Sequence, residues 1–218
     1  MKFKYAYLLL FCGVFIVSAQ EKINQFDANG KRTGVWKKYY ANKRLRYQGQ
    51  FEGGKEVGEF KFYSAQNSEH PISIKIFQEN SAISIVKFFT IKGVLESEGQ
   101  LNQKNRIGKW VFYHKDGKTM LSEEFYVNGL LEGVSKTYFE NGKIAEILNY
   151  KQGKLQGNVK RYSDTGVLLD DLNYEDGKRQ GIAKFYNIKG KLIYTGSYKN
   201  DEKVGKWKYF EDVKKLKQ

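Results

Sequence analysis

The residues best suited to catalysis or metal binding are few, and their spacing fits neither task. His70 and His114 stand 44 residues apart, without the short spacing at which two imidazoles usually bind one zinc ion. Two acidic pairs, Glu123–Glu124 and Asp170–Asp171, fall in strand-like segments, where neighbouring side chains point to opposite faces and do not act together. The sequence contains no nucleophile elbow and no phosphate-binding glycine loop. We therefore predict that the chain is not an enzyme and has no catalytic residue, cofactor or metal site.

Lysine and aromatic residues, by contrast, recur at a fixed spacing that suits binding. Eight lines of sequence can be aligned at Gly34, Gly58, Ile83, Gly108, Gly133, Gly157, Gly181 and Gly205. Lysine stands three places after six of these starts, the exceptions being Val86 and Val111, and an aromatic residue stands five places after all eight. Columns two residues apart share one face of a strand. We predict a candidate binding face made of Lys37, Tyr39, Lys61, Tyr63, Tyr113, Lys136, Tyr138, Lys160, Tyr162, Lys184, Tyr186, Lys208 and Phe210.

The aromatic columns allow two interpretations. One is structural, because rings stack across strands and stabilise a sheet by about 0.2–1 kcal/mol per pair. The other is a docking surface on which rings stack against a glycan, a peptide or a lipid surface while the lysines attract anions. The two roles are compatible. The opposite face is predicted to carry Trp36, Phe60, Ile85, Trp110, Val159 and Trp207.

The elements that must position these columns are short strands joined by tight turns. Each line is 24 or 25 residues long, with a period-two pattern interrupted by turn dipeptides such as Asp116-Gly117 and Asn141-Gly142, which favour hairpins. The counts of 22 Gly and 1 Pro fit many such turns. The unit at about 64–87 departs from the pattern, and we expect a longer loop at Gln66–Pro71 followed by strands from about Ile72 to Phe89. The predicted fold is all-β: an elongated open antiparallel sheet of about eight tandem hairpins.

The repeated pattern resembles a known repeat family. Gly-x-Trp-x-x-Tyr, followed by Asn-Gly-Lys, an aromatic residue and Asn-Gly-Lys-x-x-Gly, resembles the MORN repeat, and more closely the bacterial variant found in YwqK-like antitoxins. The segments Asn141–Ile144 and Tyr150–Gly157 carry the resemblance best, which extends over about residues 25–210. It implies hairpins laid side by side, a binding or scaffolding role, and no catalytic apparatus. The irregular unit around residues 64–83 and the missing glycine at Ile83 put continuous pairing there in question.

The N-terminal residues have the layout of a secretory signal peptide. Lys2 and Lys4 precede an apolar stretch from about Ala6 to Val17, and Val17-Ser18-Ala19 suits cleavage before Gln20. A retained N-terminal anchor is the alternative. Bulky Phe11 argues against lipidation of Cys12, the single cysteine. We expect residues 1–19 to be removed, residues 20–210 to form the repeat array, and residues 211–218 to form a basic tail.

The charge and the repeat together define the functional hypotheses. The chain has 38 Lys and Arg against 24 Asp and Glu, a net charge of +14, which favours an anionic neighbour or increases solubility. The leading hypothesis is an exported scaffold for a protein partner at the cell envelope, whether periplasmic, outer-surface or secreted. The alternatives are binding of anionic lipid or glycan, and an antitoxin- or immunity-type partner of a toxin. Export disfavours a nucleic-acid target, and open end strands allow a homo-oligomer.

Overall fold

A computed structural model describes residues 22–78 and 81–210 of the chain. The predicted signal peptide and the predicted basic tail lie outside these residues. The described part is all-β and contains no helix, so the predicted fold class is confirmed. Nor does this part contain any helix that is long and apolar enough to span a membrane. The strands are β1 (Gln25–Phe26), β2 (Arg32–Tyr39), β3 (Leu45–Glu52), β4 (Lys55–Tyr63), β5 (Pro71–Phe77), β6 (Ile83–Phe89), β7 (Leu95–Asn102), β8 (Asn105–Tyr113), β9 (Met120–Val127), β10 (Leu130–Leu131), β11 (Gly133–Tyr138), β12 (Ile144–Lys151), β13 (Lys154–Leu155), β14 (Gly157–Tyr162), β15 (Leu168–Glu175), β16 (Lys178–Arg179), β17 (Gly181–Tyr186), β18 (Leu192–Lys199) and β19 (Glu202–Tyr209).

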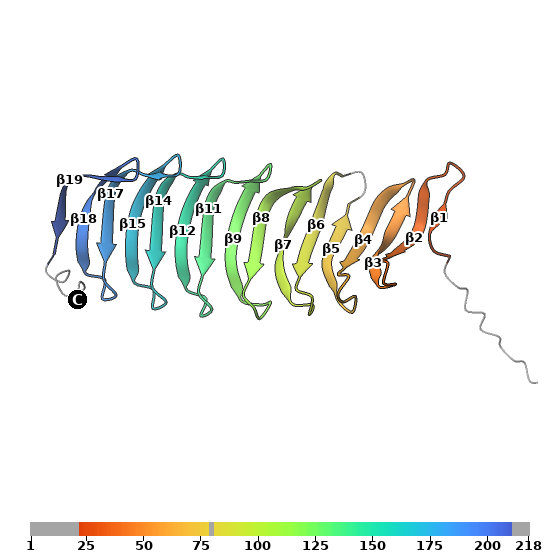
Figure 1. Cartoon of the computed structure of the whole chain (residues 1–218). Coiled ribbons are helices and arrows are strands. Elements are labelled where there is room, and N and C mark those ends of the chain that lie inside the picture. The colour runs from red at the N-terminus through yellow and green to blue at the C-terminus, as the bar shows by residue number, and fades with distance from the viewer. Residues whose placement is uncertain (1–21, 79–80, 211–218) are drawn as a thin grey trace, which may run out of the picture.

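The strands form one open antiparallel sheet of 19 strands in which each strand pairs with its neighbours in sequence. Figure 1 shows the strands side by side in a single long row, with β1 at one end and β19 at the other. The pairs β10/β11, β13/β14 and β16/β17 each act as one strand with a break, because both members pair with the same return strand. The chain therefore folds as a simple meander of hairpins.

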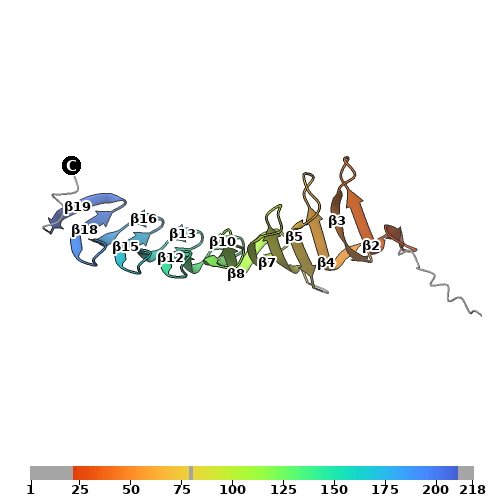
Figure 2. The same cartoon turned by 90° about the horizontal axis from the view of Figure 1, so that it is seen from below.

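The strands bend at the glycine that begins each unit. Gly157 has φ +84° and Gly181 has φ +74°, a left-handed conformation that strains any residue with a Cβ. The return strands that pair with these units, β12, β15 and β18, are visibly curved when seen from below in Figure 2. The sheet is therefore not flat in its C-terminal half.

We call the more buried face the ring face, because rings and aliphatic side chains pack along it. Trp110, Phe60, Val86 and Val159 are at most 1% exposed. Two buried clusters form, one around Trp110 and Val86 and the other around Val159 and Leu172. Contacts within each cluster run from one hairpin to the next, so the core is a strip along the molecule.

The register corrects the alignment of the irregular unit by one residue. Each unit-starting glycine faces a large residue on its return strand, as Gly34 faces Phe51 and Gly58 faces Phe77. In β6 the residue in that position is Ser84, which faces Leu101. The unit therefore starts at Ser84 and not at Ile83. The cause is the loop between β4 and β5, residues 64–70, which is two residues longer than the equivalent loop between β2 and β3.

This correction changes the predicted columns in that unit. Lys87 takes the third place in place of Val86, and Phe89 takes the fifth place in place of Phe88. Val86, not Ile85, lies in the buried column of the ring face. A longer loop before β5 is observed, but it covers residues 64–70 instead of Gln66–Pro71, and Pro71 is the first residue of β5 and pairs with Tyr63. The doubt about pairing is removed, because β4, β5, β6 and β7 pair without interruption.

Candidate functional site

The face opposite the ring face, which we call the lysine face, carries an unbroken row of cross-strand neighbours. The row runs through both strands of the first seven units and ends in β19, and it holds lysine in all opening strands but one. Its members are Lys37, Gln48, Lys61, Ile74, Lys87, Glu98, Val111, Glu123, Lys136, Ile147, Lys160, Asp171, Lys184, Thr195 and Lys208. We call it the lysine row. At about 4.8 Å between strands, its lysines recur every ~10 Å.

The aromatic column of the predicted binding face lies beside the lysine row, at the hairpin turns. In the first seven units the ring pairs with the first residue of its return strand, as Tyr138 does with Ile144 and Tyr162 with Leu168. The exposed fraction varies along the column, from 8% for Tyr63 to 51% for Tyr39. Interior rings such as Tyr63 therefore have a packing role, whereas Tyr39 and Phe210 are exposed.

Carboxylates on two return strands join the lysine and aromatic columns in the middle of the molecule. Glu123 binds Lys109 with an Nζ–Oε2 distance of 2.7 Å and Lys136 with an Nζ–Oε1 distance of 3.5 Å, and it accepts a 2.8 Å hydrogen bond from the Tyr138 hydroxyl. Glu98 accepts a 2.5 Å bond from the Tyr113 hydroxyl and lies 3.0 Å from the Nζ atom of Lys87. At both positions a lysine and an aromatic side chain contact the same carboxylate, so the two columns share one face of the sheet there, as predicted.

These contacts shift the ionisation of the groups concerned. The bonds from Lys109 and Tyr138 hold the pKa of Glu123 at about 2, because both donors stabilise the carboxylate. The bonds from Tyr113 and Lys87 also lower the pKa of Glu98. Hydrogen bonding to Glu98, together with burial, raises the pKa of Tyr113 to about 12, and burial together with the bond to Glu123 raises that of Tyr138 to about 12. The central network therefore remains in one protonation state at neutral pH.

The positive charge of the lysine row is distributed unevenly. Lys61, Lys87 and Lys136 form ion pairs with Glu59, Glu98 and Glu123. Within the described residues, no carboxylate lies within ion-pair distance of the remaining members, Lys37, Lys160, Lys184 and Lys208. Three of these four lie in the C-terminal units. The last third of the face is therefore the part best able to attract an anionic group.

Some of the basic residues pack against rings on the ring face. Arg106 lies 4.4 Å from the centroid of Trp110, and Lys203 lies 4.3 Å from that of Trp207. Such cation–π contacts stabilise exposed sites by about 0.5–1 kcal/mol.

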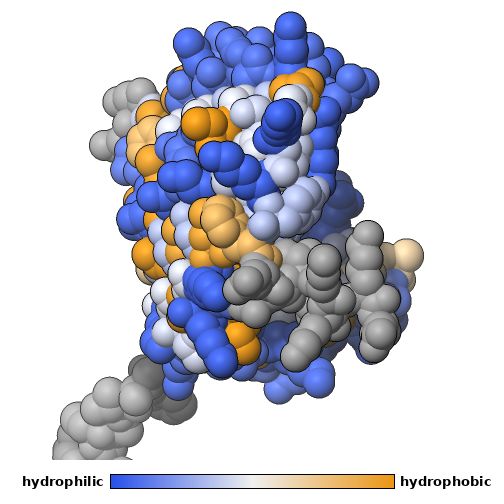
Figure 3. Space-filling model, turned by 90° about the vertical axis from the view of Figure 1, so that its left-hand side faces the viewer, coloured by the Kyte–Doolittle hydropathy of each residue, from blue (hydrophilic) through white to orange (hydrophobic). Residues whose placement is uncertain are grey.

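Figure 3 looks onto the β19 end and shows mostly hydrophilic residues with smaller apolar areas between them.

The acidic pairs and histidines have structural roles. Glu123 and Glu124 point to opposite faces as predicted, because Glu124 accepts a bond from Tyr126, a buried ring-face residue. His114 is half-buried, and its Nε2 lies 3.0 Å from the Tyr138 carbonyl of the next unit. Within residues 22–78 and 81–210, no group of three or more His, Cys, Asp or Glu residues is arranged to hold a metal ion.

The hairpin period and the face pattern agree with the comparison to known families. Three segments match the MORN repeat variant model. They are residues 32–52, 131–152 and 179–200, in the first, fifth and seventh units. No curated protein matches the sequence. The similarity to MORN repeats is therefore shown for these three segments, and the resemblance to YwqK-like antitoxins stays a prediction. Proteins built from MORN repeats are generally non-catalytic binding modules, and these segments suggest the same type of module here.

Proposed function

We propose that this chain is a non-catalytic scaffold that binds a protein partner through its lysine face. The observation that carries the proposal is the lysine row, which places a lysine on the same face in the opening strands of seven of the eight units. Repeat arrays commonly present such extended surfaces to their partners. The ring face is less suited to binding, because its central side chains are buried between hairpins.

Photo-crosslinking tests the face directly. Lys37 and Lys38 are adjacent in β2 but point to opposite faces, so they form a matched pair. We expect a photoreactive amino acid at Lys37 or Lys184 to capture a discrete partner in cells, and the same group at Lys38 to capture none. Equal capture from both faces would contradict the assignment, and no discrete product from any position would contradict the scaffold role.

We further propose export to the cell envelope. The support is the N-terminal sequence, with Lys2 and Lys4 before an apolar stretch and small residues before Gln20. Fractionation followed by mass spectrometry of the N-terminus should find a chain that begins at Gln20 in the envelope or the medium. A chain that retains Met1 and stays in the cytoplasm would be inconsistent with export.

A second candidate is binding of an anionic surface, such as acidic lipid or glycan. It is favoured by Lys160, Lys184 and Lys208, which lie in one row without neighbouring carboxylates at ion-pair distance. Co-sedimentation with vesicles should then increase with the content of anionic lipid and decrease with salt. Charge reversal of the three lysines should abolish it. Equal binding to neutral vesicles would exclude this function.

A toxin as the partner is supported by the family resemblance alone, and a toxin gene beside this one would strengthen that hypothesis.

A further inference from the structure

The junction of the fourth and fifth units departs from the repeat at four adjacent positions of the lysine face. Phe125, Val127, Leu130 and Val134 are 47–51% exposed and form what we call the apolar patch. Val127 pairs with Leu130, and Phe125 lies on β9 between β8 and β11. Leu131, the neighbour of Leu130, packs on the ring face, so Leu130 itself points to the lysine face.

The equivalent positions in other units are mostly polar. The pair that replaces Val127 and Leu130 is Glu52 and Lys55 in the first unit, and Glu175 and Lys178 in the sixth. Phe125 and Val134 correspond to Asn149 and Asn158 one unit later. The sheet therefore folds with polar residues in all four columns, and stability does not require exposed apolar side chains there. Four exposed apolar residues together are the usual sign of an interaction site.

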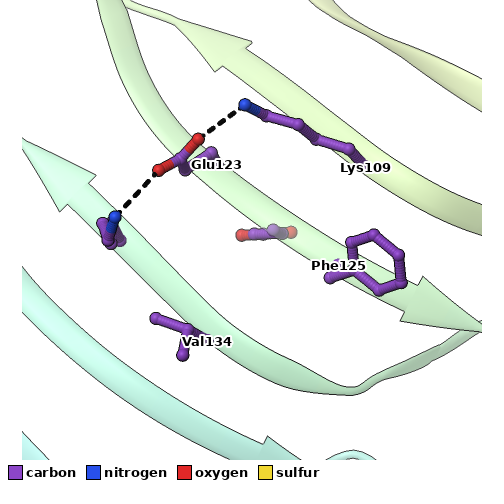
Figure 4. Close-up of a pocket in the computed structure, with 6 residues that line it drawn as sticks. Lys109, Glu123, Phe125 and Val134 are labelled. Atoms are coloured by element: carbon purple, nitrogen blue, oxygen red, sulfur yellow. Dashed lines mark ion pairs between the residues drawn. The ribbon is translucent and has the colours of Figure 1, made fainter.

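A shallow hollow of about 170 Å³ lies at the patch. It is lined by Lys109, Glu123, Glu124, Phe125, Val134 and Lys136. Figure 4 shows Phe125 and Val134 on one side and the ion pairs of Glu123 with two lysines on the other. An apolar floor beside a charged rim is the usual anatomy of the centre of a protein interface.

We propose that the apolar patch is the anchor point for a protein partner, and that it holds an apolar side chain flanked by carboxylates. The size of the hollow suits one large side chain. The acidic neighbours follow from charge complementarity, because Lys109 and Lys136 share the one carboxylate of Glu123 at the rim of the hollow, and Lys160 and Lys184 follow along the same row without a carboxylate at ion-pair distance. The proposal rests on the scaffold function and specifies the chemistry of its partner.

The repeat supplies variants that should fold. Phe125→Asn and Val134→Asn convert the patch to the residues of the next unit, at Asn149 and Asn158. Ile182→Asn is the matched control, because Ile182 occupies the same column as Val134 and is 59% exposed, but has Asn173 beside it in the place of Phe125. Circular dichroism and urea unfolding should show that all three variants keep the fold.

The binding probe is a short labelled peptide with a central phenylalanine flanked by glutamates, measured by fluorescence anisotropy against the purified protein. We expect binding to weaken about tenfold in the Phe125→Asn and Val134→Asn variants, and to be unchanged in Ile182→Asn. Peptides with serine for phenylalanine, or glutamine for glutamate, should also bind weakly.

No peptide binding, or equal binding by all three variants, would overturn the patch proposal. So would loss of binding to anionic vesicles in the Phe125→Asn variant without any peptide binding, because the patch would then be a membrane contact. Crosslinking from Lys37 and Lys184 distinguishes failure of the patch proposal from failure of the scaffold function. A partner still captured when the peptide test fails would leave the scaffold function intact.

Discussion

Glycines in three return strands allow rings to lie directly over the backbone. A Cβ added to Gly99 would stand 2.5 Å from the Trp110 ring, and equivalent contacts occur at Gly49 with Phe60 and at Gly196 with Trp207. In β15 the return strand carries Leu172 instead of glycine, and the neighbouring strand β17 carries the small residue Ala183. These two residues lie side by side, because Asp171 pairs with Lys184 in the adjacent position. Large and small residues thus alternate across the ring face, as dense packing requires.

Gly99→Ala should destabilise the protein by about 1–3 kcal/mol, because the ring of Trp110 has no room to move away. Trp110→Val alone should cost about 3 kcal/mol through lost burial. In the double variant the penalty of the alanine should largely disappear, since valine leaves the space open. Urea unfolding of the four proteins measures this coupling, and additive effects would show that the cost of the alanine does not come from contact with the Trp110 ring.

Glu123 should make stability dependent on pH in the acid range. Its folded-state pKa of about 2 lies below its ordinary value of 4.5. The stabilisation is therefore fully present above about pH 4.5 and is lost as the pH falls through the folded pKa toward 2. Glu123→Gln should lower stability at pH 7 by about 1 kcal/mol, a modest value because the three partners are partly solvated, and should flatten this acid dependence.

Glu96→Gln is the control for this change, because Glu96 is exposed on a neighbouring return strand and forms none of the ion pairs described. Unfolding by urea at several pH values between 2 and 7 compares the two variants. An acid dependence in the Glu123→Gln protein as steep as in the parent chain would locate the titrating group elsewhere.

At the scale of the strand and hairpin, the sequence was sufficient to predict the period, the two faces and the lysine column. It misplaced one unit because Ser84 replaces the glycine on which the alignment depends. It also missed the contacts of Glu98 and Glu123 with the lysine column, because these depend on the register of the return strands. A pattern of large residues opposite the unit starts, including Phe77, would have revealed the correct phase.

Deleting one whole unit should leave a folded protein. Removing residues 157–180 joins Gln156 to Gly181 and keeps every later residue on its original face, because the spacing of the units is 24 residues. Circular dichroism should remain that of a β protein, and small-angle scattering should show a molecule shorter by about 10 Å, the width of two strands.

Removing residues 157–179 instead adds one residue at the junction. That change shifts the faces of the hairpins that follow, so lysines would enter the ring face and rings would enter the lysine face. We expect this variant to lose structure in its C-terminal units. Equal folding of both deletions would mean that the face pattern does not determine the register.

At the scale of the whole molecule, contacts run mainly between strands that are adjacent or next but one in the chain. Stability is then a sum of unit terms and neighbour terms. Amides of β8 and β9, beside the fully buried Trp110, should exchange with deuterium more slowly than those of β2 and β19 at the ends. Uniform exchange along the chain would indicate a single cooperative unit.

The strands run across the long axis of the molecule, and this arrangement has a mechanical consequence. The first and last strands lie at opposite ends of the row (Figure 1), so tension applied between them acts on one strand pair at a time instead of shearing many hydrogen bonds together. Each hairpin that yields would release about 24 residues, or ~80 Å of extended chain. A chain fixed at both ends would thus lengthen in small steps at low force and re-form hairpin by hairpin when the load is removed.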